Sequence, residues 1–269
     1  MMSTKLSIIT INRNNAEGLR KTMESVFAQT YKGLEDIIVD GASIDGSVAA
    51  IRASALQAEG LQLKWTSEPD SGIYDAMNRG VRKSQGEYVL LLNSGDFLVD
   101  EHVIERVIPE LDGTDIVQGN VITTRAGQEA INRGYGKSEL TFIDVMHGHF
   151  LHQASFCRRD LFEQYGYFDE SYRINGDTVF YAKCLGFGDA TFKYVNQNIA
   201  YFDMTGISAD PEGKYRQLRK EEDARYAQMF SCRMRELLQN EEKKIKLYDK
   251  LHAHKWSWGL TMAIARLLK

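Results

Sequence analysis

The first hundred residues alternate between short apolar runs and helical patterns, and this alternation limits the fold more than any other feature. The apolar runs predict strands over Leu6–Ile11, Asp36–Asp40, Leu61–Thr66 and Val89–Leu92. The intervening stretches carry apolar residues at three-to-four spacing and predict helices over Ala16–Gln29, Ser47–Ala58 and Ile73–Lys83. Strands and helices that alternate with short loops form a mostly parallel sheet with helices on both faces.

The rest of the chain continues this pattern less regularly. We expect helices over Glu101–Leu111, Leu161–Tyr167 and Thr178–Leu185, and strands over Asp115–Thr123 and Thr191–Ile199. The segment Arg125–His152 has weak periodicity. A charged helical pattern with apolar residues at three-to-four spacing begins near residue 214. We therefore expect one α/β domain over residues 1–210 and a helical extension over residues 211–269.

Composition excludes several classes of protein. With 269 residues, a net charge of −4 and a pI near 5.9, the chain has no overall basic field that would recruit nucleic acid. Its three cysteines form no CxxC pair, which argues against a zinc site or a disulfide framework and favours a reducing, cytoplasmic setting. No stretch approaches the roughly 20 apolar residues of a membrane-spanning helix, and Met1–Thr10 is too short for a signal peptide.

Four of the predicted strands end in polar turns: Thr10–Asn14, Asp40–Asp45, Glu68–Asp70 and Asn93–Asp96. Ligands of open α/β sheets bind outside the carboxyl ends of the strands, so these turns are expected to converge on one site. Each turn alone is ordinary loop chemistry, but together they place several carboxylates at one edge. Clustered carboxylates are costly unless cations or hydrogen-bond donors compensate their charge, and a divalent cation fits best because Mg²⁺ and Mn²⁺ prefer such oxygen ligands. Neither a GxxxxGK[ST] loop nor a GxGxxG fingerprint is present.

Four motifs stand at these turns: Ile8–Asn12, Ile38–Ser47, Ser67–Gly80, and Gly86–Tyr88 followed by Leu92–Asp96. They resemble those of family 2 inverting glycosyltransferases with the GT-A fold, most closely the members of bacterial exopolysaccharide and capsule synthesis. Downstream, His152–Arg159 and Tyr165–Glu170 are similar to the acceptor half of the same family. The resemblance implies a GT-A catalytic domain over residues 1–210. Its nucleotide-binding half would cover residues 1–100 and its acceptor half residues 101–210.

The resemblance also implies roles for individual residues around the donor. Thr10, Asn12 and Asp40 would hold the nucleobase and ribose of a nucleoside-diphosphate sugar. The remaining donor residues would line or brace the nucleotide pocket: Asp45, Glu68, Asp70, Asp75 and Asn93. Asp96 would bind Mg²⁺ or Mn²⁺, with the donor diphosphate supplying further ligands. Asn93 and Gly95 stand where the family commonly has acids, which leaves one metal carboxylate.

On the acceptor side, the resemblance makes Asp177 the general base. The alternative is that Asp177 is only a helix N-cap, a position that aspartate favours. His152 and Gln153 would contact the donor diphosphate or the acceptor sugar, and no role is expected for His147 and His149. Arg13, Arg79 and Arg173 are either phosphate contacts or surface charges. The segment Thr205–Ser208 resembles a flexible active-site segment, although a plain turn would explain it equally well.

The resulting hypothesis is a hexosyltransferase-type enzyme of surface polysaccharide synthesis, with a saccharide or lipid-linked saccharide as acceptor. The apolar tail, residues 256–269, would contact the inner face of the plasma membrane, dock on the catalytic domain or form a homodimer. A binding protein of the same fold that has lost catalysis is the main alternative. A sugar-nucleotide pyrophosphorylase is disfavoured because the turn after the first strand lacks the glycines of a phosphate loop.

Overall fold

The computed structural model describes residues 5–55, 62–125, 128–204, 213–231 and 243. The chain divides into two compact units, Met1–Glu222 and Asp223–Lys269. The fold and the candidate site described below belong to the first unit. The apolar tail at residues 256–269 and the segment Thr205–Ser208 lie outside the described residues.

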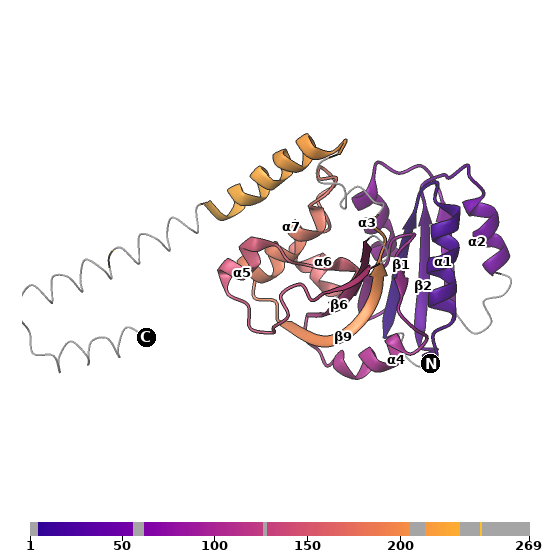
Figure 1. Ribbon diagram of the computed structural model, residues 1–269, viewed down its shortest axis with the longest axis horizontal. Coiled ribbons are helices and arrows are strands. Elements are labelled where there is room, and N and C mark those ends of the chain that lie inside the picture. The colour runs from indigo at the N-terminus through magenta and orange to yellow at the C-terminus, as the bar shows by residue number, and fades with distance from the viewer. Residues whose placement is uncertain (1–4, 56–61, 126–127, 205–212, 232–242, 244–269) are drawn as a thin grey trace, which may run out of the picture. The chain divides into compact units, whose positions relative to one another are not determined.

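The amino-terminal part of the first unit has the expected alternation of strands and helices (Figure 1). Its elements are β1 (Leu6–Asn12), α1 (Ala16–Phe27), β2 (Leu34–Asp40), α2 (Ser47–Ala55), β3 (Gln62–Ser67), α3 (Ile73–Lys83) and β4 (Tyr88–Leu91). The four strands lie side by side in the order β3-β2-β1-β4, and every pairing among them is parallel. The predicted α/β architecture with a parallel sheet is therefore confirmed for this part.

Helices cover both faces of this parallel part, because successive side chains of a strand point to opposite sides. Ile8 of β1 belongs to a buried cluster with Val26 of α1. Its neighbour Ile9 faces α3, where a Cβ added to Gly80 would collide with the Ile9 side chain. Ile8 and Ile9 are both fully buried. Burying one such side chain contributes about 1.5–3 kcal/mol, so the strand is held from both sides.

The second part of the unit adds shorter elements. Its strands are β5 (Phe97–Leu98), β6 (Ile116–Arg125), β7 (Gln128–Asn132), β8 (Ser155–Arg158) and β9 (Phe192–Phe202). Its helices are α4 (Val103–Val107), α5 (Phe142–His147), α6 (Asp160–Tyr165) and α7 (Gly176–Ala182). The 3-10 helices η1 (Ile108–Glu110) and η2 (His152–Ala154) and the π-helix η3 (Lys183–Phe187) complete the set.

These strands extend the sheet to the order β3-β2-β1-β4-β8-β6-β9-β5, with β7 paired to β6. Strand β8 lies antiparallel between β4 and β6, and the long strand β9 pairs in parallel with β6 (Figure 1). The sequence did not predict β5, β7 or β8. Strand β8 has only four residues, and Phe156 at its centre is fully buried against distant parts of the chain. Its insertion into the sheet brings η2 next to the end of β4.

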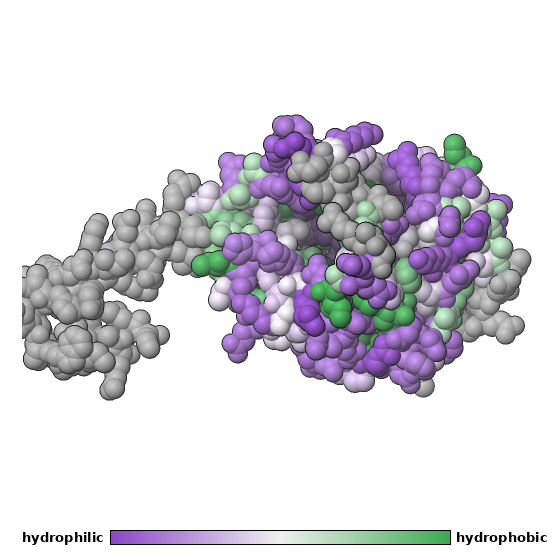
Figure 2. Space-filling model, in the orientation of Figure 1, coloured by the Kyte–Doolittle hydropathy of each residue, from purple (hydrophilic) through white to green (hydrophobic). Residues whose placement is uncertain are grey.

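Hydrophilic residues predominate on the face shown in Figure 2, where hydrophobic residues gather only in small patches. The large hydrophobic side chains found exposed among the described residues are Ile44, Ile131, Ile143 and Phe187. Within the described ranges, no helix is long and apolar enough to cross a membrane.

Candidate active site

Two cavities open at the carboxyl edge of the parallel strands. The first has a volume of about 530 Å³ and lies between the Asn93–Asp96 turn after β4, the turn η2 and the start of α7. The second has a volume of about 630 Å³ and lies between the end of β1 and the start of α3. The two cavities share Asn15, Ile73, Asn93, Ser94 and Arg173. They are therefore adjoining parts of one site.

Asp40 organises the floor beside the second cavity. It is fully buried, and its carboxylate accepts hydrogen bonds from Asn12 Nδ2 at 2.7 Å, Ser43 N at 3.0 Å, Ser43 Oγ at 2.6 Å and Ser67 Oγ at 2.6 Å. Burial by itself would raise the pKa of Asp40, but the bonds from Ser43 and Ser67 outweigh it and hold the pKa below its usual value. An ionised Asp40 thus ties the ends of β1, β2 and β3 together, and Asn12 lines the cavity above it.

Of the other residues predicted to bind the sugar nucleotide, only some lie at the cavities. Asp70 lines the second cavity and lies 3.8 Å from the guanidinium of Arg13. Asp75 instead accepts hydrogen bonds from Ser71 N and Arg79 Nε, both at 2.9 Å, and braces the start of α3.

The remaining predicted residues lie away from the cavities. Thr10 is buried within β1, and Glu68 is exposed. Asp45 accepts hydrogen bonds from the backbone N–H groups of Ala16 and Ser47. Thr10, Asp40, Asp45, Glu68 and Asp75 line neither cavity.

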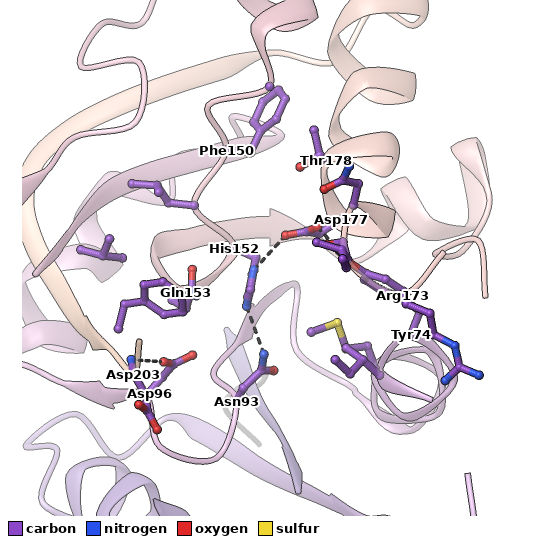
Figure 3. Close-up of a pocket in the computed structure, with 18 of the residues that line it drawn as sticks. Tyr74, Asn93, Asp96, Phe150, His152, Gln153, Arg173, Asp177, Thr178 and Asp203 are labelled. Atoms are coloured by element: carbon purple, nitrogen blue, oxygen red, sulfur yellow. Dashed lines mark hydrogen bonds and ion pairs between the residues drawn. The ribbon is translucent and has the colours of Figure 1, made fainter. Parts of the chain in front are cut away.

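Asp96 lies at the bottom of the first cavity, where its side chain meets Asp203 from the end of β9 (Figure 3). Asp203 N donates to Asp96 Oδ1 at 2.8 Å. Burial, with a smaller contribution from the nearby Asp203 charge, raises the pKa of Asp96 to about 7. Gly95, next to Asp96 in the sequence, has φ 107°, and an added Cβ there would collide with the Asp203 carboxylate. The positive φ therefore favours glycine at a position where the family commonly has an acid.

His152 of η2 and Asp177 of α7 form a buried pair on the opposite wall. Asp177 Oδ2 lies 2.9 Å from His152 Nδ1, and the two side chains are only 12% and 14% exposed. Burial would raise the pKa of Asp177 and lower that of His152. Their mutual hydrogen bond and charge outweigh burial in both cases, so the pKa of Asp177 is lowered and that of His152 is raised. The pair therefore favours an aspartate anion and an imidazolium.

Tyr74 and Asn93 complete the surroundings of this pair. The Tyr74 hydroxyl lies 3.1 Å from Asp177 Oδ1 and 2.7 Å from the carbonyl oxygen of Ile174. Asn93 Nδ2 lies 3.3 Å from His152 Nε2, while Asn93 Oδ1 is buried and has no hydrogen-bond partner among the described residues. Helix α7 begins at Gly176 with Asn175 at its N-cap, so Asp177 occupies the first turn and is not the cap. The cap-only alternative is therefore wrong.

The residues around Asp96 fit a divalent cation whose remaining ligands come from a bound molecule. Asp96 is a buried carboxylate beside Asp203, and burial raises the pKa of Asp96 more than the charge of nearby His152 lowers it. No group of three or more histidine, cysteine, aspartate or glutamate side chains with metal-ligand geometry occurs within the described ranges. Mg²⁺ is commonly held by one or two carboxylates together with substrate phosphates. The carboxylates of Asp96 and Asp203 thus suit a cation that binds together with a phosphorylated ligand.

The structure brings together the predicted residues Asn93, Asp96, His152, Gln153 and Asp177, which all line the first cavity. Arg173, considered either a phosphate contact or a surface charge, lines both cavities. Sequence reasoning missed Tyr74 and Asp203. Tyr74 stands within the Ser67–Gly80 motif, and Asp203 stands two residues before the segment Thr205–Ser208, so the motifs could have drawn attention to both.

Comparison with curated proteins gives consistent relatives. The chain is 30% identical over 233 residues to an uncharacterized glycosyltransferase of Mycobacterium tuberculosis, covering 80% of this chain and 82% of that protein. It is 32% identical over 214 residues to a PGL/p-HBAD biosynthesis glycosyltransferase of Mycobacterium bovis, covering 77% of this chain and 80% of that protein.

Solved structures share the fold at lower sequence identity. Staphylococcus aureus TarS 1–349 in complex with UDP-GlcNAc superposes with a TM-score of 0.64 at 18% identity, covering 78% of this chain and 61% of that one. The mannosyltransferase PcManGT of Pyrobaculum calidifontis, in complex with GDP-Man and Mn²⁺, has a TM-score of 0.59 at 20% identity, covering 80% and 59%. This chain thus spans about 60% of the length of these two structures.

The family model described as glycosyl transferase family 2 matches residues 7–166. This range includes β2, β3, β4 and all but the first residue of β1, together with the Asn93–Asp96 turn and η2. From this match and the curated relatives, we conclude that the chain belongs to glycosyl transferase family 2.

Proposed function

We propose that this chain is an inverting glycosyltransferase that moves a hexose-type sugar from a nucleoside diphosphate to a saccharide or lipid-linked saccharide. The observation that carries the proposal is the pairing of Asp177 with His152 on the wall of the same cavity that contains Asp96 (Figure 3). An inverting transfer needs one base beside the acceptor hydroxyl, opposite the leaving diphosphate. Asp177 and Asp96 come from different elements and are suited to these two places.

In the proposed reaction, the acceptor hydroxyl gives its proton to Asp177 as its oxygen bonds to the anomeric carbon. The bond from that carbon to the diphosphate oxygen breaks, and the electron pair leaves with the diphosphate. His152 keeps Asp177 ionised before the transfer, and Tyr74 restrains the second carboxylate oxygen. Mg²⁺ or Mn²⁺ held by Asp96, with Asp203 beside it, would supply positive charge to the leaving diphosphate.

The second cavity would receive the nucleoside. Asn12, Asp70 and the floor built on Asp40 offer hydrogen-bonding groups there. Two structural neighbours are complexes with UDP-GlcNAc and GDP-Man, which supports a nucleoside-diphosphate sugar as donor. Thr10, Glu68 and Asp75 line neither cavity, so an effect of these residues on the donor would be indirect.

The acceptor is proposed from the relatives' names. One relative is named a PGL/p-HBAD biosynthesis glycosyltransferase, and for this chain we propose a saccharide or lipid-linked saccharide acceptor in surface polysaccharide synthesis. We place the enzyme in the cytoplasm. Residues 211–269 would serve as a contact with the inner face of the plasma membrane or with a second copy of the chain.

A binding protein without turnover is the second candidate, favoured only by Asn93 and Gly95 where acids are common. A screen of UDP-, GDP- and dTDP-sugars with and without Mn²⁺ separates the two. We expect one donor class to raise the melting temperature only with Mn²⁺, and that donor to yield a product of inverted anomeric configuration by NMR. Donor binding without turnover on any saccharide or lipid-linked acceptor would instead support the binding protein.

A further inference from the structure

A buried carboxylate from outside the family match holds the turn that precedes the proposed base. Residues 216–222 are helical, and Glu222 on this helix is only 1% exposed. Its Oε1 accepts the backbone N–H of Arg173 at 2.6 Å. Its Oε2 accepts the N–H groups of Ile174 at 3.0 Å and Asn175 at 2.9 Å. Three consecutive amides of one turn therefore converge on one side chain.

This arrangement fixes the entry into helix α7. Hydrogen bonds to an ionised acceptor are about twice as strong as neutral ones, and Asn175 at the N-cap makes no side-chain cap bond. The opposite side of the turn is held by Tyr74, whose hydroxyl lies 2.7 Å from the carbonyl oxygen of Ile174. The turn is thus clamped between α3 and the helix that carries Glu222. Asp177 follows two residues after the clamped segment.

We propose that Glu222 is a positioning residue of the transfer reaction, which orients residues 173–175 so that Asp177 meets both His152 and the acceptor hydroxyl. This inference rests on the proposed function, because it assumes that Asp177 is the base. Glu222 itself lines neither cavity and would touch no substrate. Residues 216–222, at the end of the first compact unit, would then belong to the catalytic machinery.

The titratable groups that face Asp177 are His152 from η2, Tyr74 from α3 and, one turn further along α7, Tyr181. Loosening the turn would weaken the contact with His152, because both η2 and α7 must keep their positions for the 2.9 Å contact. The expected consequence is a lower kcat. In a plot of kcat against pH, the acid limb, where the rate falls as Asp177 becomes protonated, should lie at higher pH. A purely structural role of Glu222 would lower the melting temperature without moving the acid limb of the folded enzyme.

The test compares Glu222→Gln with Glu221→Gln, since Glu221 is exposed on the same helix and its one described bond is to Gln217. The full-length chain is assayed with the donor found in the screen, well below its melting temperature. For Glu222→Gln we expect kcat to fall at least tenfold and the acid limb to move to higher pH. Amide hydrogen exchange, followed by mass spectrometry, should accelerate at least tenfold in the peptide covering residues 172–178. Glu221→Gln should match the wild type in all three.

Wild-type kcat in Glu222→Gln would overturn the inference, as would a loss of rate with an unchanged acid limb or unchanged exchange at residues 173–175. If Glu222→Gln does not fold, exchange in the wild type decides, because unprotected amides at 173–175 would contradict the clamp. Asp177→Asn separates this inference from the proposed function. Full activity of Asp177→Asn would contradict the assignment of Asp177 as the base. An inactive Asp177→Asn beside a fully active Glu222→Gln would contradict only the proposed role of Glu222.

Discussion

His152 Nδ1 lies 2.9 Å from Asp177 Oδ2, and this contact joins η2 to the first turn of α7, 25 residues later in the sequence. Both side chains are largely buried, and each stabilises the charged form of the other. Asn93 lies 3.3 Å from His152, so the pair connects the Asn93–Asp96 turn to helix α7. It therefore links the part of the site proposed for the diphosphate to the part proposed for the acceptor hydroxyl.

Replacing His152 is expected to change the pH dependence of transfer. In His152→Gln, burial of Asp177 persists but the imidazolium charge is lost, so the pKa of Asp177 should rise. An opposite charge at this distance typically lowers a carboxyl pKa by about 1–3 units. The acid limb should therefore move up by at least one pH unit, measured as kcat against pH. His147→Gln is the control, because His147 is exposed on α5, and an unshifted limb in His152→Gln would contradict the pairing.

The same pair should make stability depend on pH at two limits. The pKa of Asp177 is lowered on folding, so its contribution is present above the usual aspartate pKa near 3.8 and is lost as pH falls through the lowered value. The pKa of His152 is raised above 6.5, so its contribution is present below 6.5 and is lost as pH rises through the raised value. Urea unfolding of wild type and His152→Gln should differ most between these limits. A difference that grows above the raised pKa of His152 would contradict this sign.

Metal binding should depend on the two neighbouring acids at the bottom of the first cavity. We expect Asp96→Asn to abolish the Mn²⁺-dependent gain in affinity for a nucleoside diphosphate in calorimetry. Asp203→Asn should weaken it at least about tenfold, as changes beside a metal ligand often do. Glu24→Gln, on the exposed side of α1, serves as the control. Unchanged Mn²⁺ dependence in both aspartate variants would place the cation elsewhere.

Asp36 is a buried acid away from the site whose replacement should stabilise the protein. Both of its carboxylate oxygens are buried without a partner among the described residues, and burial raises its pKa to about 7. A carboxyl pKa that is higher in the folded state costs stability as pH rises from 3.8 to that value. Three pKa units correspond to about 4 kcal/mol at 1.36 kcal/mol per unit.

Asp36→Asn should therefore gain stability over the wild type at pH 8 and match it near pH 4. Urea unfolding at the two pH values measures both differences, and the comparison at pH 4 is the internal control. An equal difference at both pH values would mean that the effect comes from packing and not from the charge of Asp36.

Local patterns predicted much of the fold because they are read from neighbouring residues. Helix α3 was predicted over Ile73–Lys83 and has those bounds. Strand β8 was missed because its four residues have no period of their own and are buried by pairing with β4 and β6. Such pairing depends on residues far away in the sequence.

The site was predictable as a set of residues but not as an arrangement. The strand-end turns indicated Asn93 and Asp96, and the family motifs added His152 and Asp177, yet no pattern indicated that the last two form a pair. Glu222 was hidden for a related reason. It stands in a strongly charged helical pattern, where glutamate ordinarily faces water, and its burial depends on three backbone amides about 48 residues earlier.

The most direct test of the account is the transfer rate of Asp177→Asn, measured beside its affinity for the donor. Asparagine keeps the shape of the side chain but cannot accept the proton of the acceptor hydroxyl. We expect kcat to fall by about 10²–10⁴-fold, while the dissociation constant for the nucleoside-diphosphate sugar with Mn²⁺ stays within threefold of wild type. A variant that transfers sugar at the wild-type rate would contradict the assignment of Asp177 as the base.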